Sequence, residues 1–349
     1  MKKRFFIATI FLTFLLLPLL ASEQTGEKPL TLEAMISLRS IGTVAISPSG
    51  QQVVFDVTSV DWQRNTFKSD VWLADTVSHQ CYAITKGPDM NMAAAWSPDG
   101  QAITFLSTRL GKTQLFIFRP CQGEAEPLIE APEGVQKYAW SPDGKSIAFL
   151  IPEAPDKDQQ KSRETGFDAV AIDTGKPRSQ MMLFDLATKN IKPLVSGDFH
   201  IVGFSWSPDG SKIAFVTSPK NLEPVIWDSQ TLCIVNRDGS GMQSLDFRYF
   251  PVYSRQGVAT WSPDGRYLGL EVGDLSKPEL HNHIIQVYDF KTGKAFNASG
   301  NTDHFLYNCH WSSDGGEYLL PRLLSHERPN LPARSSEERS SAAFSFSQD

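Results

Sequence analysis

The chain has 349 residues, of which 41% are hydrophobic, 21% charged and 11% aromatic. This composition is typical of a globular protein with enough apolar residues for a core, which excludes a disordered chain, a collagen and a coiled coil. The formal net charge is −6 at pH 7. An acidic chain is a poor partner for nucleic acid, because phosphate contacts need clustered lysine and arginine.

The first 22 residues have the pattern of an export signal. Residues 2–4 are basic, and residues 5–20 follow without a charge. This apolar run is short for a bilayer span, which needs about 20 residues, but it is long enough for the core of a signal peptide. We therefore expect cleavage after Ala21 or Ser22 and a periplasmic or secreted protein without membrane attachment. An uncleaved membrane anchor is the alternative.

One five-residue motif recurs six times along the chain, with its serines 50, 44, 66, 55 and 50 residues apart. Such spacing of a Gly/aromatic motif is typical of β-propeller blades. The proline fixes the first corner of a turn, and the glycine supplies the left-handed position that closes a hairpin. The copies are Ile46-Ser47-Pro48-Ser49-Gly50, Trp96-Ser97-Pro98-Asp99-Gly100, Trp140-Ser141-Pro142-Asp143-Gly144, Trp206-Ser207-Pro208-Asp209-Gly210, Trp261-Ser262-Pro263-Asp264-Gly265 and Trp311-Ser312-Ser313-Asp314-Gly315.

Each turn is expected to join the first two strands of a blade. In the second strand, large residues two positions apart flank a small one, which suits a sheet packed on both faces. The predicted third strands are Val71–Asp75, Gln114–Phe118, Met181–Asp185, Leu232–Asn236 and Ile284–Asp289. The predicted fourth strands are Cys81–Thr85, Pro127–Glu130, Ile191–Val195, Gln243–Phe247 and Lys294–Asn297. Residues 23–320 are therefore predicted to form an all-β fold, a β-propeller of about six four-stranded blades.

Two features interrupt the pattern. Residues 152–180 form a charged insertion that is expected to extend from the rim of the third blade. In the sixth repeat, Pro321 falls inside an expected strand, where it would remove a ladder donor. We therefore expect an incomplete last blade with no third strand, a disordered tail over residues 321–349, and apolar surface left uncovered on the strand Ile284–Asp289.

The motif copies resemble the propeller repeats of TolB and of the N-terminal domain of prolyl oligopeptidase family serine peptidases. Residues 31–35, 166–170 and 196–200 are similar to the peptidases, notably to acylaminoacyl and dipeptidyl peptidases. TolB carries a separate α/β domain before its propeller, and about 24 residues between the signal and the first turn are too few for it. The resemblance covers roughly residues 30–320.

The resemblance implies no catalytic residue in this chain. Such peptidases carry an α/β-hydrolase domain after the propeller, with its nucleophile in a Gly-x-Ser-x-Gly turn. That motif is absent here, and only 34 residues follow the sixth copy of the repeat. We therefore expect no enzymatic activity, and a frameshift or premature stop in a peptidase sequence is one way to produce such a chain.

The best candidates for ligand binding are Arg163, Glu164 and Asp168 in the insertion. The resemblance implies that such insertions approach the peptidase cavity and hold the charged ends of peptides. A solvated rim loop is the alternative for all three residues.

Other polar patterns have structural explanations. The pair His281 and His283 lacks a nearby third metal ligand, and the segment 198–200 lacks a serine partner. The sequon that begins at Asn297 is a triplet common by chance. Turn chemistry accounts for the apparent acidic ring of Asp99, Asp143, Asp209 and Asp264. No metal and no cofactor are expected.

The four cysteines lie 40, 112 and 76 residues apart, far from a metal-ligand spacing. We expect them to be small buried hydrophobic residues, with disulfide pairing as the alternative in an exported protein. They are Cys81, Cys121, Cys233 and Cys309.

The leading hypothesis is an exported, non-enzymatic binding or scaffold propeller for a peptide or protein ligand, held by loops at the channel mouth and by the insertion. One alternative is the propeller half of a serine peptidase, gating access of peptide substrates, whose catalytic domain is missing or separately encoded. Another is a TolB-like periplasmic protein-binding propeller.

Overall fold

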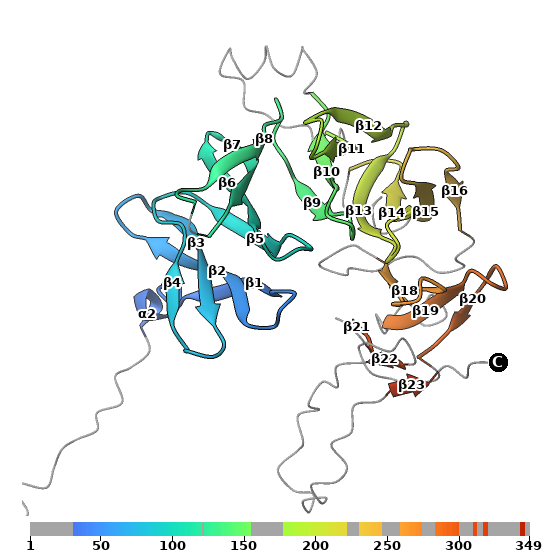
Figure 1. The fold of residues 1–349 in the computed structure, drawn as a ribbon, viewed down its shortest axis with the longest axis horizontal. Helices are drawn as coiled ribbons and strands as arrows, with labels where there is room; N and C mark the ends of the chain where they lie inside the picture. The colour runs from blue at the N-terminus through green and yellow to red at the C-terminus, as the bar shows by residue number, and fades with distance from the viewer. Residues whose placement is uncertain are drawn as a thin grey trace, which may run out of the picture.

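The computed structural model describes residues 31–120, 122–154, 177–221, 230–245, 259–273, 283–299, 310–312, 317–319 and 343–345. These residues form one short helix and six antiparallel sheets, which are the blades of a β-propeller. Figure 1 shows the blades following one another in chain order around an arc, with the first and the sixth blade at its two ends. The predicted all-β propeller fold is therefore confirmed.

Five blades have four strands in the order of the sequence, as expected. Helix α2 (Leu32–Ile36) precedes the first blade. That blade contains β1 (Ser40–Ile46), β2 (Gln52–Asp61), β3 (Thr66–Asp75) and β4 (Cys81–Ala83). The second contains β5 (Asn91–Trp96), β6 (Ile103–Leu110), β7 (Lys112–Phe118) and β8 (Glu126–Ile129). The third contains β9 (Lys137–Trp140), β10 (Ser146–Pro152), β11 (Ser179–Asp185) and β12 (Ile191–Val195).

The remaining blades become shorter toward the C-terminus. The fourth contains β13 (His200–Trp206), β14 (Lys212–Ser218), β15 (Thr231–Asn236) and β16 (Gln243–Ser244). The fifth contains β17 (Thr260–Trp261), β18 (Tyr267–Gly273), β19 (His283–Asp289) and β20 (Lys294–Asn297). The sixth contains β21 (His310–Trp311), β22 (Glu317–Leu319) and β23 (Ala343–Ser345).

The core lies between neighbouring blades, and the alternation within the second strand explains how. In β10, Ile147 and Phe149 join a buried cluster shared with the second blade. Ala148 and Leu150 join the cluster shared with the fourth blade. Because successive side chains point to opposite faces of a strand, one strand contributes to both interfaces. The same arrangement produces clusters between the first and second blades and between the fourth and fifth.

The sixth blade has three strands, so the expected incomplete last blade is confirmed. Two details expected for the C-terminal end, the lack of a third strand and an uncovered fifth blade, are wrong. The tail supplies a third strand to the sixth blade, because β23 pairs with β22 through Tyr318 and Phe344. The rest of residues 321–349 lies outside the described residues. The strand Ile284–Asp289 is not uncovered either, since Ile285 and Val287 are fully buried.

The exposed apolar surface lies instead at the N-terminal end. In β1, Ile41, Val44 and Ile46 are 65%, 56% and 67% exposed, and α2 has no buried residue. At the two cysteines that the structure describes, Cys233 is buried as expected, whereas Cys81 is exposed. Among the described residues, no helix is long and apolar enough to cross a membrane, and residues 1–30 are not among them.

Candidate binding site between neighbouring blades

The recurring motif builds the same hydrogen-bonded turn in every described copy that contains aspartate. In the third blade, the Ser141 hydroxyl donates to Asp143 Oδ1 at 2.6 Å, and the same oxygen accepts the amide of Lys145 at 3.1 Å. The amide of Ser146 donates to Ser141 Oγ at 2.9 Å. One carboxylate oxygen therefore belongs to the turn, and the other, Oδ2, faces outward for further contacts.

The turns stand side by side, with each turn glycine close to the proline of the preceding turn. Gly144 and Gly210 both have a φ of 68°, a left-handed conformation that favours glycine. A Cβ added to Gly210 would lie 3.4 Å from Pro142 Cδ, and one added to Gly144 would lie 3.8 Å from Pro98 Cδ. The outward-facing carboxylates of successive turns therefore lie on one face of the arc, next to the blade interfaces.

The tryptophan of each motif ties its blade to the preceding one. Trp206 Nε1 donates to Ala139 O at 3.2 Å, and Trp96 Nε1 donates to Ala45 O at the same distance. Trp140 Nε1 reaches Thr104 Oγ1, and Trp311 Nε1 reaches Thr260 O. Among the described copies, Trp261 is the exception, because its buried Nε1 has no hydrogen-bond partner.

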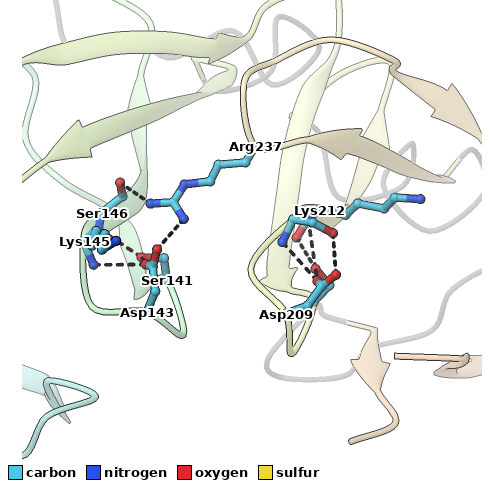
Figure 2. Close-up of polar contacts among 9 residues, drawn as sticks. Ser141, Asp143, Lys145, Ser146, Asp209, Lys212 and Arg237 are labelled. Atoms are coloured by element: carbon cyan, nitrogen blue, oxygen red, sulfur yellow. Dashed lines mark hydrogen bonds and ion pairs between the residues drawn. The ribbon is translucent and has the colours of Figure 1, made fainter. Parts of the chain in front are cut away.

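At the interface of the third and fourth blades, an arginine fills the space above the tryptophan. Arg237 follows β15 and donates to Asp143 Oδ2 at 2.7 Å and to Ser146 Oγ at 2.9 Å (Figure 2). Its Cζ lies 5.7 Å from the centre of the Trp206 ring. The turn carboxylate and the ring together thus hold a guanidinium group, which is a favourable arrangement for both charge and stacking.

At the interface of the fourth and fifth blades, the same position is aromatic. Phe290 follows β19 as Arg237 follows β15, and its ring stacks on Trp261 with centroids 5.2 Å apart. A cavity of about 430 Å³ opens here, lined by both turns and both rings. Lys212 replaces Ser146 of the neighbouring interface, and its side chain extends away from Asp209 (Figure 2), with Nζ 5.9 Å from the Phe290 ring centre.

Both turn carboxylates are ionised at neutral pH. Desolvation acts to raise the pKa of Asp143, but the hydrogen bonds from Arg237 and Ser141 outweigh it and hold the pKa well below its usual range. The pKa of Asp209 is lowered by the hydrogen bonds from Ser207 and Ser211. Asp209 Oδ2 accepts the Ser211 hydroxyl at 2.7 Å. Within the described ranges, no cation lies within ion-pair distance of Asp209, so its charge lacks the counterion that Asp143 has.

The residues predicted for ligand binding, Arg163, Glu164 and Asp168, lie outside the described residues, so their assignment stays a prediction. The structure does describe the base of the insertion. There Arg178 forms ion pairs with Glu153 at 3.4 Å and with Asp198. These contacts join the third blade to the loop before the fourth.

The remaining patterns have structural roles where the structure describes them. His200 is buried, and its Nδ1 accepts the amide of Ser179 at 3.1 Å. Asn297 Oδ1 accepts the amide and the hydroxyl of Ser299 at 2.9 and 2.7 Å. His281 is outside the described residues. Among the described residues, no group of three or more histidine, cysteine or acidic side chains could hold a metal ion.

Sequence reasoning did not single out Arg237, Phe290 or Lys212. Arg237 and Phe290 both directly follow the last residue of a third strand, so an alignment of the repeats would have exposed the difference. From the sequence, the aspartates are explained by their role in the turn. This is correct for Oδ1, which accepts hydrogen bonds within the turn, but it does not account for the contacts of Oδ2.

The fold and the repeated turns define the class of the protein, a β-propeller with Trp-Ser-Pro-Asp-Gly turns. No family model matches the chain. It is 25% identical to the uncharacterized peptidase YuxL of Bacillus subtilis over 205 residues, which is 54% of this chain and 31% of YuxL. It is also 25% identical to dipeptidyl-peptidase 5 of Porphyromonas gingivalis over 334 residues, 86% of this chain and 47% of the relative. The expected relationship to peptidases is therefore confirmed, and the chain spans less than half of either relative.

Solved structures confirm the fold. The acylaminoacyl peptidase of Pyrococcus horikoshii aligns with 82% of this chain and 43% of its own, at 14% identity and a TM-score of 0.57. The propeller domain of the trilobed protease of Pyrococcus furiosus aligns with 82% of this chain and 78% of its own, at 13% identity and a TM-score of 0.53. TolB of Acinetobacter baumannii aligns with 81% of this chain and 60% of its own, at 17% identity and a TM-score of 0.46.

Proposed function

We propose that this chain is an exported, non-enzymatic propeller that binds a protein partner on the exposed apolar surface of its N-terminal end. The observation that carries the proposal is the exposure of strand β1 and helix α2. Ile46 occupies the motif position of Trp96 and Trp206, which are each 8% exposed, yet Ile46 is 67% exposed. An apolar surface of this kind is typical of a protein-interaction site.

The composition of this surface supports a protein partner. Besides the β1 residues, Leu32, Met35 and Leu38 are 67%, 52% and 71% exposed. The helix is fixed at its start by Thr31, whose hydroxyl accepts the amide of Ala34 at 3.1 Å. At the four interfaces among the first five blades, apolar side chains of the neighbouring blade pack against the equivalent strand. We expect the partner to present a similarly apolar sheet or loop surface.

Site-specific photo-crosslinking tests this proposal. A benzoylphenylalanine residue is placed at Ile46, and a control residue is placed at exposed Lys145 in the third turn. In cells that make the protein, we expect a discrete protein adduct from position 46 and none from position 145. The absence of an adduct from position 46, or the same adduct from both positions, contradicts the proposal.

A second candidate is the propeller half of a serine peptidase that assembles with a separate catalytic chain. It is favoured by the curated relatives, which are peptidases of which this chain spans 31% and 47%. An adduct at position 46 that contains a Gly-x-Ser-x-Gly nucleophile selects this candidate.

Export and the lack of activity are tested on the purified chain. We expect its intact mass to lack residues 1–21 or 1–22, and a fluorophosphonate probe to leave it unlabelled. A mass that includes residues 1–21 contradicts export with cleavage. Labelling that a single serine-to-alanine substitution abolishes contradicts the lack of enzymatic activity.

A further inference from the structure

We propose that the cavity between the fourth and fifth blades binds a guanidinium group, the arginine side chain of a peptide. This inference concerns a different part of the molecule from the N-terminal surface, so either proposal can fail without the other.

The neighbouring interface shows how such a group is held. There the guanidinium of Arg237 lies 5.7 Å from the Trp206 ring centre, with Asp143 Oδ2 at 2.7 Å. The geometry comes from the repeat itself, because the tryptophan and the aspartate belong to consecutive motif copies. An arginine side chain is therefore the natural occupant of the space between two successive turns.

The cavity between the fourth and fifth blades repeats this framework, and none of the described residues that line it is an arginine. Asp209 occupies the position of Asp143, and Trp261 occupies that of Trp206. Phe290 takes the place of Arg237 and stacks on Trp261 instead of reaching back to the preceding turn. The result is an acidic rim over an aromatic floor, with Asp264 adding a second carboxylate.

The size of the cavity and the orientation of its charges suit this ligand. A volume of about 430 Å³ is within the range of about 300–1,000 Å³ that is typical of ligand pockets, and it accommodates one long side chain. Asp209 and Asp264 are exposed at the rim, whereas Trp261 and Phe290 are half-buried. A planar guanidinium can stack on a ring and pair with a carboxylate at once, which an ammonium group does less well.

Lys212 sets the strength of this site. Its side chain extends away from Asp209 (Figure 2), and its Nζ lies 5.9 Å from the centre of the Phe290 ring. Within the described residues, the Asp209 carboxylate therefore has no ion-pair partner. The positive charge of Lys212 nevertheless weakens the attraction for a cation. Serine at this position would reproduce Ser146, which accepts a hydrogen bond from Arg237 at 2.9 Å. The substitution Lys212→Ser should therefore tighten binding several-fold.

An NMR titration with Nα-acetyl-arginine amide tests the proposal. The signal to follow is the indole N–H of Trp261, assigned by its loss in Trp261→Phe. We expect a saturable shift of this signal with the arginine compound and a weaker one with Nα-acetyl-lysine amide. The neutral isostere Nα-acetyl-citrulline amide should produce none.

Matched variants separate the site from general effects on the turn. Asp209→Asn should weaken binding at least tenfold, while Asp99→Asn makes the same change in a turn outside the cavity and should leave it unaltered. Phe290→Arg should abolish binding, because it supplies the internal arginine that the neighbouring interface already has.

The absence of a shift with the arginine compound overturns the proposal. So does an equal shift with the citrulline compound, or an affinity that is unchanged in both Asp209→Asn and Phe290→Arg.

Discussion

The interfaces on either side of the fourth blade are built from the same motif and differ in how they are closed. Between the third and fourth blades, Arg237 joins two turns, and Trp206 donates to the preceding blade. Between the fourth and fifth, Phe290 stacks on Trp261, whose N–H has no hydrogen-bond partner in the part of the chain that the structure describes, and a cavity is present. The residue that follows the third strand, Arg237 in one interface and Phe290 in the other, thus accompanies the difference between a filled interface and one with a cavity.

The comparison shows that the motif builds the same turn in each blade, while residues outside the motif make the two interfaces different. The serine, the proline and the glycine are used in forming the turn, as is one aspartate oxygen. The second aspartate oxygen and the tryptophan face are then available, and the sequence between the motifs decides what they contact.

The largest expected effect is a loss of folding stability at low pH, caused by protonation of His200 at the interface of the third and fourth blades. Burial, with a smaller effect of the Lys137 charge, lowers the pKa of His200 to about 4 from 6.5. The unfolded chain binds this proton more readily than the native one, so stability is present above pH 6.5 and is lost as the pH falls toward 4. A shift of this size corresponds to about 3 kcal/mol.

Protonation also breaks the hydrogen bond across the interface, because a protonated His200 Nδ1 cannot accept the amide of Ser179. Urea unfolding of the native chain and of His200→Asn at pH 7 and pH 4 measures the effect. We expect the variant, whose amide oxygen can still accept, to lose about 3 kcal/mol less. Equal losses in the two proteins contradict this assignment.

The next largest effect is a difference in stability between substitutions of Trp206 and of Trp261. Trp206→Phe removes the hydrogen bond from the indole to Ala139 O, whereas Trp261→Phe removes an N–H that has no hydrogen-bond partner among the described residues. Because a buried unsatisfied group costs about 1–3 kcal/mol, Trp206→Phe should lower the free energy of unfolding by about 1–2 kcal/mol more. Trp96→Phe serves as a control and should resemble Trp206→Phe. Equal costs at Trp206 and Trp261 would show that the hydrogen bond does not distinguish the interfaces.

The smallest effect concerns the ion pair itself. Arg237 and Asp143 have side chains that are 30% and 36% exposed, so solvent screens their attraction, and Arg237→Met should cost only about 1 kcal/mol. The cost should shrink in 1 M salt, as expected for a screened pair. Phe290→Met is the control in the open interface, and its cost should not fall with salt. An Arg237→Met cost that is independent of salt would indicate that packing of the arginine stem dominates.

The blades could be predicted from the sequence because their signals are local. Proline and glycine at fixed spacing specify a turn whatever surrounds it, and the large-small-large pattern after Gly144 specifies a strand buried on both faces. The predicted third strand Met181–Asp185 and fourth strand Ile191–Val195 match β11 and β12 closely.

The ends of the arc and the cavity could not be predicted, because they depend on contacts between residues that lie in different repeats and are far apart in the sequence. The pattern of Ile284–Asp289 contains no information on which residues cover it, so its burial was missed. The exposure of Ile46 was missed for the same reason. Likewise, the different roles of Arg237 and Phe290 appear only once the preceding turn is placed beside them.

The close approach of successive turns also limits the sequence at the turn glycines. A Cβ added at Gly100 would lie 3.3 Å from Pro48, and one added at Gly265 would lie 3.8 Å from Pro208. The two glycines have φ angles of 69° and 72°, a backbone conformation that residues with a side chain rarely adopt. A substitution at either glycine would therefore strain the turn even where the space beside it could hold a methyl group.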